Sequence, residues 1–302
     1  MHCRRPNKPK ILVIAGPTSS GKTELAVHLA KIINGEIISA DSRQVYKGLD
    51  IGTGKVTKKE MKGVPHHLIN VVSPKMTFTV VQYKKLAEKK IAKIIKRGKV
   101  PIIAGGTGFY IQAVIDDLTL PSAVPNPSLR KKLEKKSASH LFKKLQRLDP
   151  RRGKTIDSKN KRRLIRAIEI ASALGKVPKL KNKVSPYEIL YIGIATTEKQ
   201  LKKKINIRLF AQIRAGMIAE AEGLHDKGLT FKRMDELGLE YRYLARFLQK
   251  KITKEEMIQK LTAEIWKYAK RQKTWFKRDR RIVWFELKQA KIIERTVVQF
   301  LK

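Results

Sequence analysis

The sequence predicts an α/β fold with a mostly parallel sheet, interrupted by a basic, all-helical insertion. Short apolar runs that end in turn residues alternate with segments in which apolar residues recur every three or four positions. One long stretch lacks strand-like runs and carries 20 Lys or Arg against four acids between residues 130 and 183. With 302 residues, the chain can form one large core and a smaller appendage.

The strands are expected at residues 11–15, 36–40, 100–104, 190–195 and 282–287, because each run is short, apolar and bounded by turn residues. Helices are expected at residues 24–33, 80–96, 198–227, 234–249 and 254–277, where apolar residues repeat at helical spacing. Strands that alternate with helices form parallel sheets that are covered on both faces.

A domain boundary is expected where the strand and helix rhythm stops. The stretch "LPSAVPNPSLR", which begins at Leu120, holds three prolines and therefore must be extended or turning. Helical patterns resume at residues 133–148 and 160–174. We therefore expect a discontinuous core of residues 1–117 and 186–302, with a helical insertion over residues 118–185.

The composition points to a polyanionic partner. Lys and Arg number 68 against 26 acids, for a formal net charge of +42, which makes nucleic acid the leading partner. A Lys-rich composition shared by a whole proteome is the alternative reading of this charge. The single cysteine, Cys3, excludes a disulfide framework and fits a reducing cytoplasm. No apolar run approaches the ~20 residues needed to span a bilayer, so we expect a cytoplasmic protein without a membrane partner.

A phosphate-binding motif follows the first expected strand. The stretch "GPTSSGKT" fits G-x-x-x-x-G-K-[ST] between a strand and an amphipathic helix, the context in which backbone N–H groups cradle phosphate. Lys22 adds a positive charge, and the Thr23 hydroxyl is the candidate ligand for Mg²⁺. The motif identifies a diphosphate group rather than ATP. Its residues are Gly16, Pro17, Thr18, Ser19, Ser20, Gly21, Lys22 and Thr23.

The acidic residues around this motif leave its chemistry open. Asp41 ends the second expected strand, in "EIISADSRQVY", whereas the later strand "VPIIAGGTGFY" has no acid where a Walker-B acid would often lie. That absence counts against a nucleotide kinase without excluding it. From the residues alone, Asp41 fits a helix N-cap or a general base equally well.

At this point the sequence resembles tRNA dimethylallyltransferases. The resemblance rests on "GPTSSGKT", "ISADSRQVYKGLDIGTGK", "VPHHLINVVSP", "IIAGGTGFYIQAV", "RRLIRAIEI", "LGLEYR" and "AKRQKTWFKRD", which follow the family order and span nearly the whole chain. It implies a P-loop NTPase-like core and a reaction in which dimethylallyl diphosphate gives its dimethylallyl group to N6 of adenosine-37 beside the tRNA anticodon. Diphosphate is then expelled, and the product is i6A.

The resemblance also implies roles for particular residues. Asp41 corresponds to the general base, Thr107 to a hydrogen-bonding group near the bridging oxygen, and Arg208 to the arginine that grips the diphosphate. "LGLEYR" departs from the bacterial version, in which a Gly directly precedes the Tyr. The tRNA-contacting positions implied are Asp41, Ser42, Arg43, Gln44, Arg130, Arg162, Arg163, Arg166, Gly238, Tyr241 and Arg242.

The partners implied are the anticodon stem-loop of tRNA and dimethylallyl diphosphate, with Mg²⁺ as cofactor and a monomeric protein. Three other functions compete. One is prenylation of a free adenine nucleotide, against which the charge of the insertion argues. The second is a P-loop nucleotide kinase. The third is an RNA-binding module without enzymatic activity, whose nucleotide site is regulatory.

Overall fold

The computed structural model describes residues 8–179 and 184–302, and Cys3 lies outside them. The chain divides into two compact units. The first combines Met1–Asp117 with Val184–Lys302, and the second is Leu118–Lys183.

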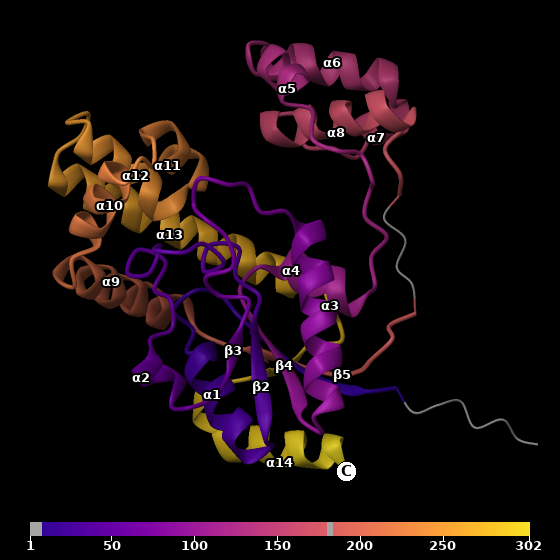
Figure 1. Ribbon diagram of the computed structural model, residues 1–302, viewed down its shortest axis with the longest axis vertical. Helices are drawn as coiled ribbons and strands as arrows, with labels where there is room; N and C mark the ends of the chain where they lie inside the picture. Colours follow the sequence, from indigo (N-terminus) through magenta and orange to yellow (C-terminus); the bar gives the residue numbers. More distant parts are fainter. Residues whose placement is uncertain (1–7, 180–183) are drawn as a thin grey trace, which may run out of the picture. The chain divides into compact units, whose positions relative to one another are not determined.

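The first unit is built on a parallel sheet (Figure 1). Its six strands follow the spatial order β3-β2-β4-β1-β5-β6. Every pair of neighbours is parallel, so the carboxyl ends of the strands meet at one edge. The strands are β1 (Lys10–Ala15), β2 (Gly35–Ser39), β3 (His66–His67), β4 (Val100–Gly105), β5 (Glu188–Ile194) and β6 (Val283–Phe285).

Both faces of the sheet are apolar and covered by helices, which confirms the α/β prediction. Alternate residues of β1 belong to two clusters: Ile11 and Val13 pack on one face, Leu12 and Ile14 on the other. Residues of α3 (Val80–Lys96), α4 (Gly108–Ile115) and α13 (Lys254–Phe276) cover the first face. Residues of α1 (Lys22–Ile32) and α14 (Ala290–Leu301) cover the second. The sequence patterns above do not predict α14.

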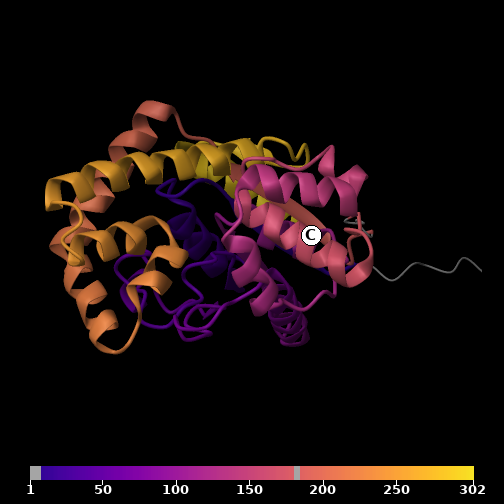
Figure 2. The same cartoon turned by 90° about the horizontal axis from the view of Figure 1, so that it is seen from above.

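A third apolar cluster of this unit lies among five helices. In Figures 1 and 2, α13 extends from the group of helices α9–α12 towards α4. The group contains α9 (Glu198–Arg214), α10 (Met217–Asp226), α11 (Phe231–Leu237) and α12 (Leu239–Leu248). The short elements of the unit are α2 (Lys58–Met61) and the 3₁₀ helix η1 (Leu287–Gln289).

Two expected helices are wrong in their length because each is broken at a glycine. The segment 198–227 divides at Gly216, which has a φ of 96°, and the segment 234–249 divides at Gly238, with a φ of 75°. Leu239 follows with a φ of 42°. Apolar periodicity continues across both breaks, so the pattern alone does not reveal them.

In its described part, residues 118–179, the second unit has four helices around its own apolar core. They are α5 (Pro127–Glu134), α6 (Ala138–Leu148), α7 (Pro150–Gly153) and α8 (Lys161–Leu174). The expected helix 133–148 is in fact broken before α6, where the Ser137 side chain accepts a hydrogen bond from His140 N and caps the new helix. The core residues include Leu141, Leu145, Leu164 and Ile168.

Candidate active site

Three chemically distinct loops meet at the carboxyl edge of the sheet. The P-loop follows β1, Asp41 follows β2, and Thr107 follows β4. The register Ala15↔Gly105 and Ser39↔Ala104 aligns the ends of these strands. Thr107 N donates to Ala40 O at 3.0 Å, which fixes the third loop against the second.

Gly105 permits this close approach. A Cβ placed on Gly105 would lie 2.2 Å from Ala40 O, a backbone atom that cannot move aside. Only a residue without a side chain therefore lets the strand ends bring Asp41 and Thr107 together.

The P-loop forms the turn between β1 and the first residue of α1. Ser19 and Gly21 have φ values of 61° and 91°, which curl the backbone around the start of the helix. The Oγ atoms of Ser19 and Ser20 are buried and have no hydrogen-bond partner among the described residues. Lys22 Nζ donates to Pro17 O at 3.1 Å. The loop thus presents unpaired hydroxyls and a helix N-terminus, which suit an anion.

The charge of Lys22 is sensitive to its surroundings. Desolvation lowers the pKa of Lys22 to about 8, Asp41 opposes that change, and the positive charge of Arg208 adds to it. Asp41 and Arg208 are thus the two charged groups that act on the pKa of Lys22. An anion beside Lys22 would favour the protonated amine.

Gln272 of α13 connects the P-loop to the loop after β4. Thr18 N donates to Gln272 Oε1 at 2.8 Å, and Gln272 Nε2 donates to Gly106 O at 2.9 Å. The side chain is buried, so both amide groups need partners, and each finds a backbone atom. One residue therefore sets the spacing between the two loops.

Asp41 organises its own loop. Its Oδ1 accepts from Arg43 N at 2.8 Å and from Gln44 N at 3.3 Å, the Asx arrangement that stabilises a turn. Among the described residues, Oδ2 has no hydrogen-bond partner. Thr107 Oγ1 accepts from Ser42 N at 3.0 Å. One carboxylate oxygen thus supports the turn, while the other is available to accept a proton.

Arg208 of α9 lies against the P-loop. Its guanidinium donates to Thr53 O at 3.0 Å, to Gly54 O at 3.2 Å and, at the long distance of 3.5 Å, to Thr18 Oγ1. The side chain is half-buried. The two carbonyls fix its orientation, which leaves a planar cation suited to phosphate oxygens.

The segment Gly238–Arg242 forms the turn into α12. Tyr241 is only 1% exposed, and its hydroxyl donates to Glu220 Oε1 at 2.6 Å, so its side chain packs inside the unit. Arg242 is half-buried and donates to Asp235 O at 3.3 Å. Burial raises the pKa of Glu240 to about 7; Asp41 acts in the same direction, whereas its own backbone N–H, Arg208 and Arg43 oppose it.

Four of the sequence-predicted arginines lie in the second unit. Arg162 and Arg163 are exposed at the start of α8. Arg130 instead holds the buried Glu169 with two hydrogen bonds, at 2.9 and 2.8 Å, and Arg166 donates to the same carboxylate. Burial alone would raise the pKa of the Glu169 carboxyl. Hydrogen bonds from Arg130, Asn126 N and Arg166 outweigh this effect and lower the pKa of Glu169 to about 2.

The sequence predicts that the Thr23 hydroxyl is a ligand of Mg²⁺. Its side chain is exposed at the start of α1, and a hydroxyl is a hard oxygen ligand that suits this ion. The described residues contain no group of three or more His, Cys, Asp or Glu side chains that could hold a metal by themselves. Mg²⁺ usually keeps several waters and binds substrate phosphates, and a single hydroxyl ligand from the protein fits this pattern.

Several polar residues of this site were not selected from the sequence. Gln272 occurs in "AKRQKTWFKRD", and Gln212 and Glu220 in the expected helix 198–227, without an assigned role. Gln212 and Glu220 bind the backbone of Ile51, 161 and 169 residues away, and Gln272 binds the backbone of Thr18 and Gly106, 254 and 166 residues away. The one available signal is a polar residue on the apolar face of a helix.

No helix among the described residues is long and apolar enough to cross a membrane.

Known proteins resemble this chain over nearly its whole length. A family model described as IPP transferase matches residues 44–279. A tRNA dimethylallyltransferase of Anoxybacillus flavithermus is 39% identical, covering 97% of this chain and 95% of the relative. A solved tRNA isopentenylpyrophosphate transferase of Bacillus halodurans has a TM-score of 0.75 and 37% identity, covering 97% of both chains. Crystallographic snapshots of a eukaryotic dimethylallyltransferase acting on tRNA match with a TM-score of 0.75 and 26% identity, over 88% of this chain and 69% of the other.

Proposed function

Since the chain belongs to the IPP transferase family, we propose that this tRNA-modifying prenyltransferase moves the dimethylallyl group of dimethylallyl diphosphate to N6 of adenosine-37. The adenine nitrogen forms a bond to the allylic carbon. The carbon–oxygen bond to the diphosphate breaks, and its electron pair leaves with the oxygen. The N6 proton passes to Asp41.

The observation that carries the proposal is the juxtaposition of an anion cradle with a carboxylate. Lys22 belongs to the P-loop and Arg208 contacts it at Thr18, so both supply positive charge to the cradle. Charge develops on the bridging oxygen as the bond breaks, and cations and N–H groups placed there in advance stabilise it. The cradle therefore holds a leaving group.

Asp41 is the proposed general base. An exocyclic amine is a poor nucleophile until its proton has an acceptor. Oδ1 is occupied by the turn, whereas Oδ2 has no partner among the described residues. Thr107, which accepts from the backbone of the same loop, is proposed to direct its hydroxyl proton towards the bridging oxygen.

Mg²⁺ is the proposed cofactor, with the Thr23 hydroxyl as its protein ligand. The ion supplies charge neutralisation for the departing diphosphate. Residues 16–23 bind the remaining charge through the helix N-terminus and Lys22.

The tRNA contacts are proposed for two sets of residues. In the first unit, the segment Asp41–Gln44 and the half-buried Arg242 face the nucleotide. In the second unit, the exposed Arg162 and Arg163 contact phosphate, which positions RNA without reading its sequence. Because Arg130 and Arg166 hold Glu169 and Tyr241 is buried, we propose that these three support the binding elements instead. The target base must leave its stack to reach the allylic carbon.

We also propose that the enzyme acts in the cytoplasm as a monomer and recognises the anticodon stem-loop of tRNA. The relatives' names do not favour a nucleotide kinase, an adenylate isopentenyltransferase or a binding module without activity. The test is a substrate panel: full tRNA, an anticodon stem-loop, the same stem-loop with guanosine at position 37, and free AMP. Modification of the first two alone supports the proposal, whereas modification of AMP or of the guanosine variant contradicts it.

A further inference from the structure

The loop of residues 50–54 contacts both Arg208 and Gln44 of the candidate site. The carbonyls of Thr53 and Gly54 orient Arg208, and Gly54 O also accepts from Gln44 Nε2 at 3.3 Å. The same short loop therefore positions one residue proposed for the diphosphate and one proposed for tRNA. A Cβ on Gly54 would lie 1.8 Å from a guanidinium nitrogen of Arg208, so the loop and the arginine fit closely.

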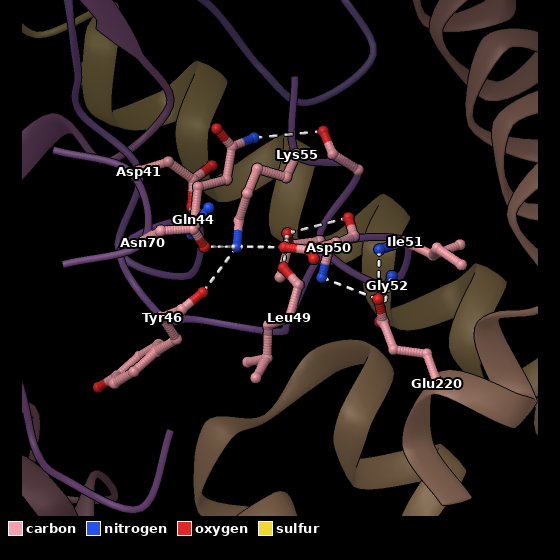
Figure 3. A network of polar contacts seen from close by, with 12 residues as sticks. Asp41, Gln44, Tyr46, Leu49, Asp50, Ile51, Gly52, Lys55, Asn70 and Glu220 are labelled. Atoms are coloured by element: carbon pink, nitrogen blue, oxygen red, sulfur yellow. Dashed lines mark hydrogen bonds and ion pairs between the residues drawn. The ribbon is translucent and has the colours of Figure 1, made fainter. Parts of the chain in front are cut away.

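Glu220 of α10 holds this loop with one carboxylate (Figure 3). Its Oε2 accepts from Asp50 N at 2.9 Å and Ile51 N at 2.7 Å, and its Oε1 accepts from Gly52 N at 2.9 Å. Three successive N–H groups thus converge on a single negative charge. Such charge-assisted bonds are stronger than those between neutral groups.

The opposite side of the loop is held as well. Gln212 Nε2 of α9 donates to Ile51 O at 2.5 Å and Gly52 O at 3.1 Å. At the end of the loop, Lys55 Nζ donates to Tyr46 O at 2.7 Å and to Asn70 Oδ1 at 2.6 Å, as Figure 3 shows. Side chains therefore bind the N–H groups of residues 50–52 and the carbonyls of residues 51–54, while Gly54 N donates to Ile51 O at 2.9 Å within the loop.

Tyr241 fixes the carboxylate itself. Its hydroxyl donates to Glu220 Oε1 at 2.6 Å from the first turn of α12. Burial and the charge of Glu220 raise the pKa of Tyr241, so the phenol keeps its proton and remains a donor. Glu220 is consequently oriented by the element that also carries Glu240 and Arg242.

We propose that Glu220 is a positioning residue for the transfer reaction. By fixing residues 50–54, its carboxylate places Arg208 against the diphosphate and Gln44 beside the nucleotide. This inference rests on the proposed function of Arg208. Because the loop of residues 50–54 is already ordered by these hydrogen bonds, less conformational entropy is lost when substrate and catalytic groups reach their reactive geometry.

The first test compares Glu220→Gln with Glu222→Gln on the same helix, where the side chain is exposed. Glutamine has one acceptor oxygen, so either the Asp50–Ile51 pair or the Gly52–Tyr241 pair loses its acceptor. We expect kcat/KM for dimethylallyl diphosphate to fall roughly tenfold or more, the factor associated with one charge-assisted hydrogen bond. Amide exchange in residues 49–55 should accelerate in Glu220→Gln only. Unchanged exchange and activity would overturn the proposal.

The second test asks whether Glu220 acts through Arg208. The affinity for inorganic diphosphate is measured for Glu220→Gln, Arg208→Ala and the double variant. If Glu220 works through Arg208, the double variant binds no more weakly than Arg208→Ala. Losses that multiply would show an independent role and refute the inference. Unchanged binding by Arg208→Ala would instead contradict the proposed function of that arginine.

A milder variant guards against misfolding. Tyr241→Phe removes the side-chain anchor of the carboxylate but keeps the ring in the core. If Glu220→Gln does not accumulate as folded protein, Tyr241→Phe replaces it in both tests, with an expected loss of a few-fold in diphosphate affinity. Wild-type affinity together with wild-type exchange in residues 49–55 would refute the proposal.

Discussion

Asp41→Asn separates the chemical role of this residue from its structural role. The asparagine keeps Oδ1, so it retains the hydrogen bonds from Arg43 N and Gln44 N that hold the turn. It replaces Oδ2, the oxygen without a partner among the described residues, by an amide that accepts no proton. The fold should therefore be unaffected while the reaction slows.

The expected magnitudes differ for the two properties. General base catalysis contributes roughly 10²- to 10⁴-fold, so the barrier should rise by roughly 3–5 kcal/mol. Asp41→Ala also loses the two hydrogen bonds of the turn, so its free energy of unfolding should fall by roughly 1–3 kcal/mol. The unfolding free energy of Asp41→Asn should stay close to that of the wild type.

The assay is single-turnover transfer to an anticodon stem-loop at saturating dimethylallyl diphosphate, with urea unfolding of each variant measured in parallel. Asp226→Asn is the control, because Asp226 is exposed on α10. A transfer rate for Asp41→Asn within about threefold of the wild type would refute the base assignment, since such a change lies far below the contribution of a general base.

Three further predictions concern Lys22, Gly105 and Glu169. Desolvation lowers the pKa of Lys22 to about 8, so its amine loses its charge above that pH. The value of kcat/KM for dimethylallyl diphosphate should therefore decline above pH 8, and Lys22→Arg should remove the decline. A flat wild-type profile would contradict this prediction. Gly105→Ala should lower activity at least tenfold and the unfolding free energy by roughly 2 kcal/mol, since its Cβ would meet Ala40 O at 2.2 Å, whereas Gly223→Ala meets nothing within 4 Å and should behave as wild type. The paired Glu169 has its pKa lowered from 4.5 to about 2, so it stabilises the second unit by up to roughly 3 kcal/mol above pH 4.5 and loses this effect as the pH falls towards 2. Amide exchange in residues 127–174 should rise at neutral pH in Glu169→Gln; equal exchange in both proteins would contradict the pairing.

Every strand of the described sheet except β3 was predictable, because apolar runs and turn residues act locally, whereas β3 (His66–His67) has no apolar run of its own. The P-loop identified the end of β1, and the order of strands along the chain placed Asp41 and Thr107 after β2 and β4. That the three loops meet follows from a parallel sheet, whose carboxyl ends share one edge. Local patterns could not locate the breaks at Gly216 and Gly238, because glycine is also tolerated inside helices.

The supporting residues of the site were hidden for a different reason. Glu220, Gln212 and Gln272 bind backbone atoms far away in the sequence, and a backbone group leaves no signature in the residue that carries it. The arginines of the second unit illustrate the converse. Arg130 and Arg166 fit a basic, RNA-facing pattern, yet a single buried acid, Glu169, binds both. One acid among many cations gives little warning of this pairing.

In the proposed reaction the P-loop holds the diphosphate that is expelled, while the dimethylallyl carbon is transferred. The direct measurement uses dimethylallyl diphosphate labelled in both the allyl carbon and the phosphates, incubated with tRNA and Mg²⁺. We expect the carbon label to enter the tRNA nucleoside in equal amount to the diphosphate released. Phosphate label in the tRNA, or phosphate transfer from labelled ATP without carbon transfer, would contradict it.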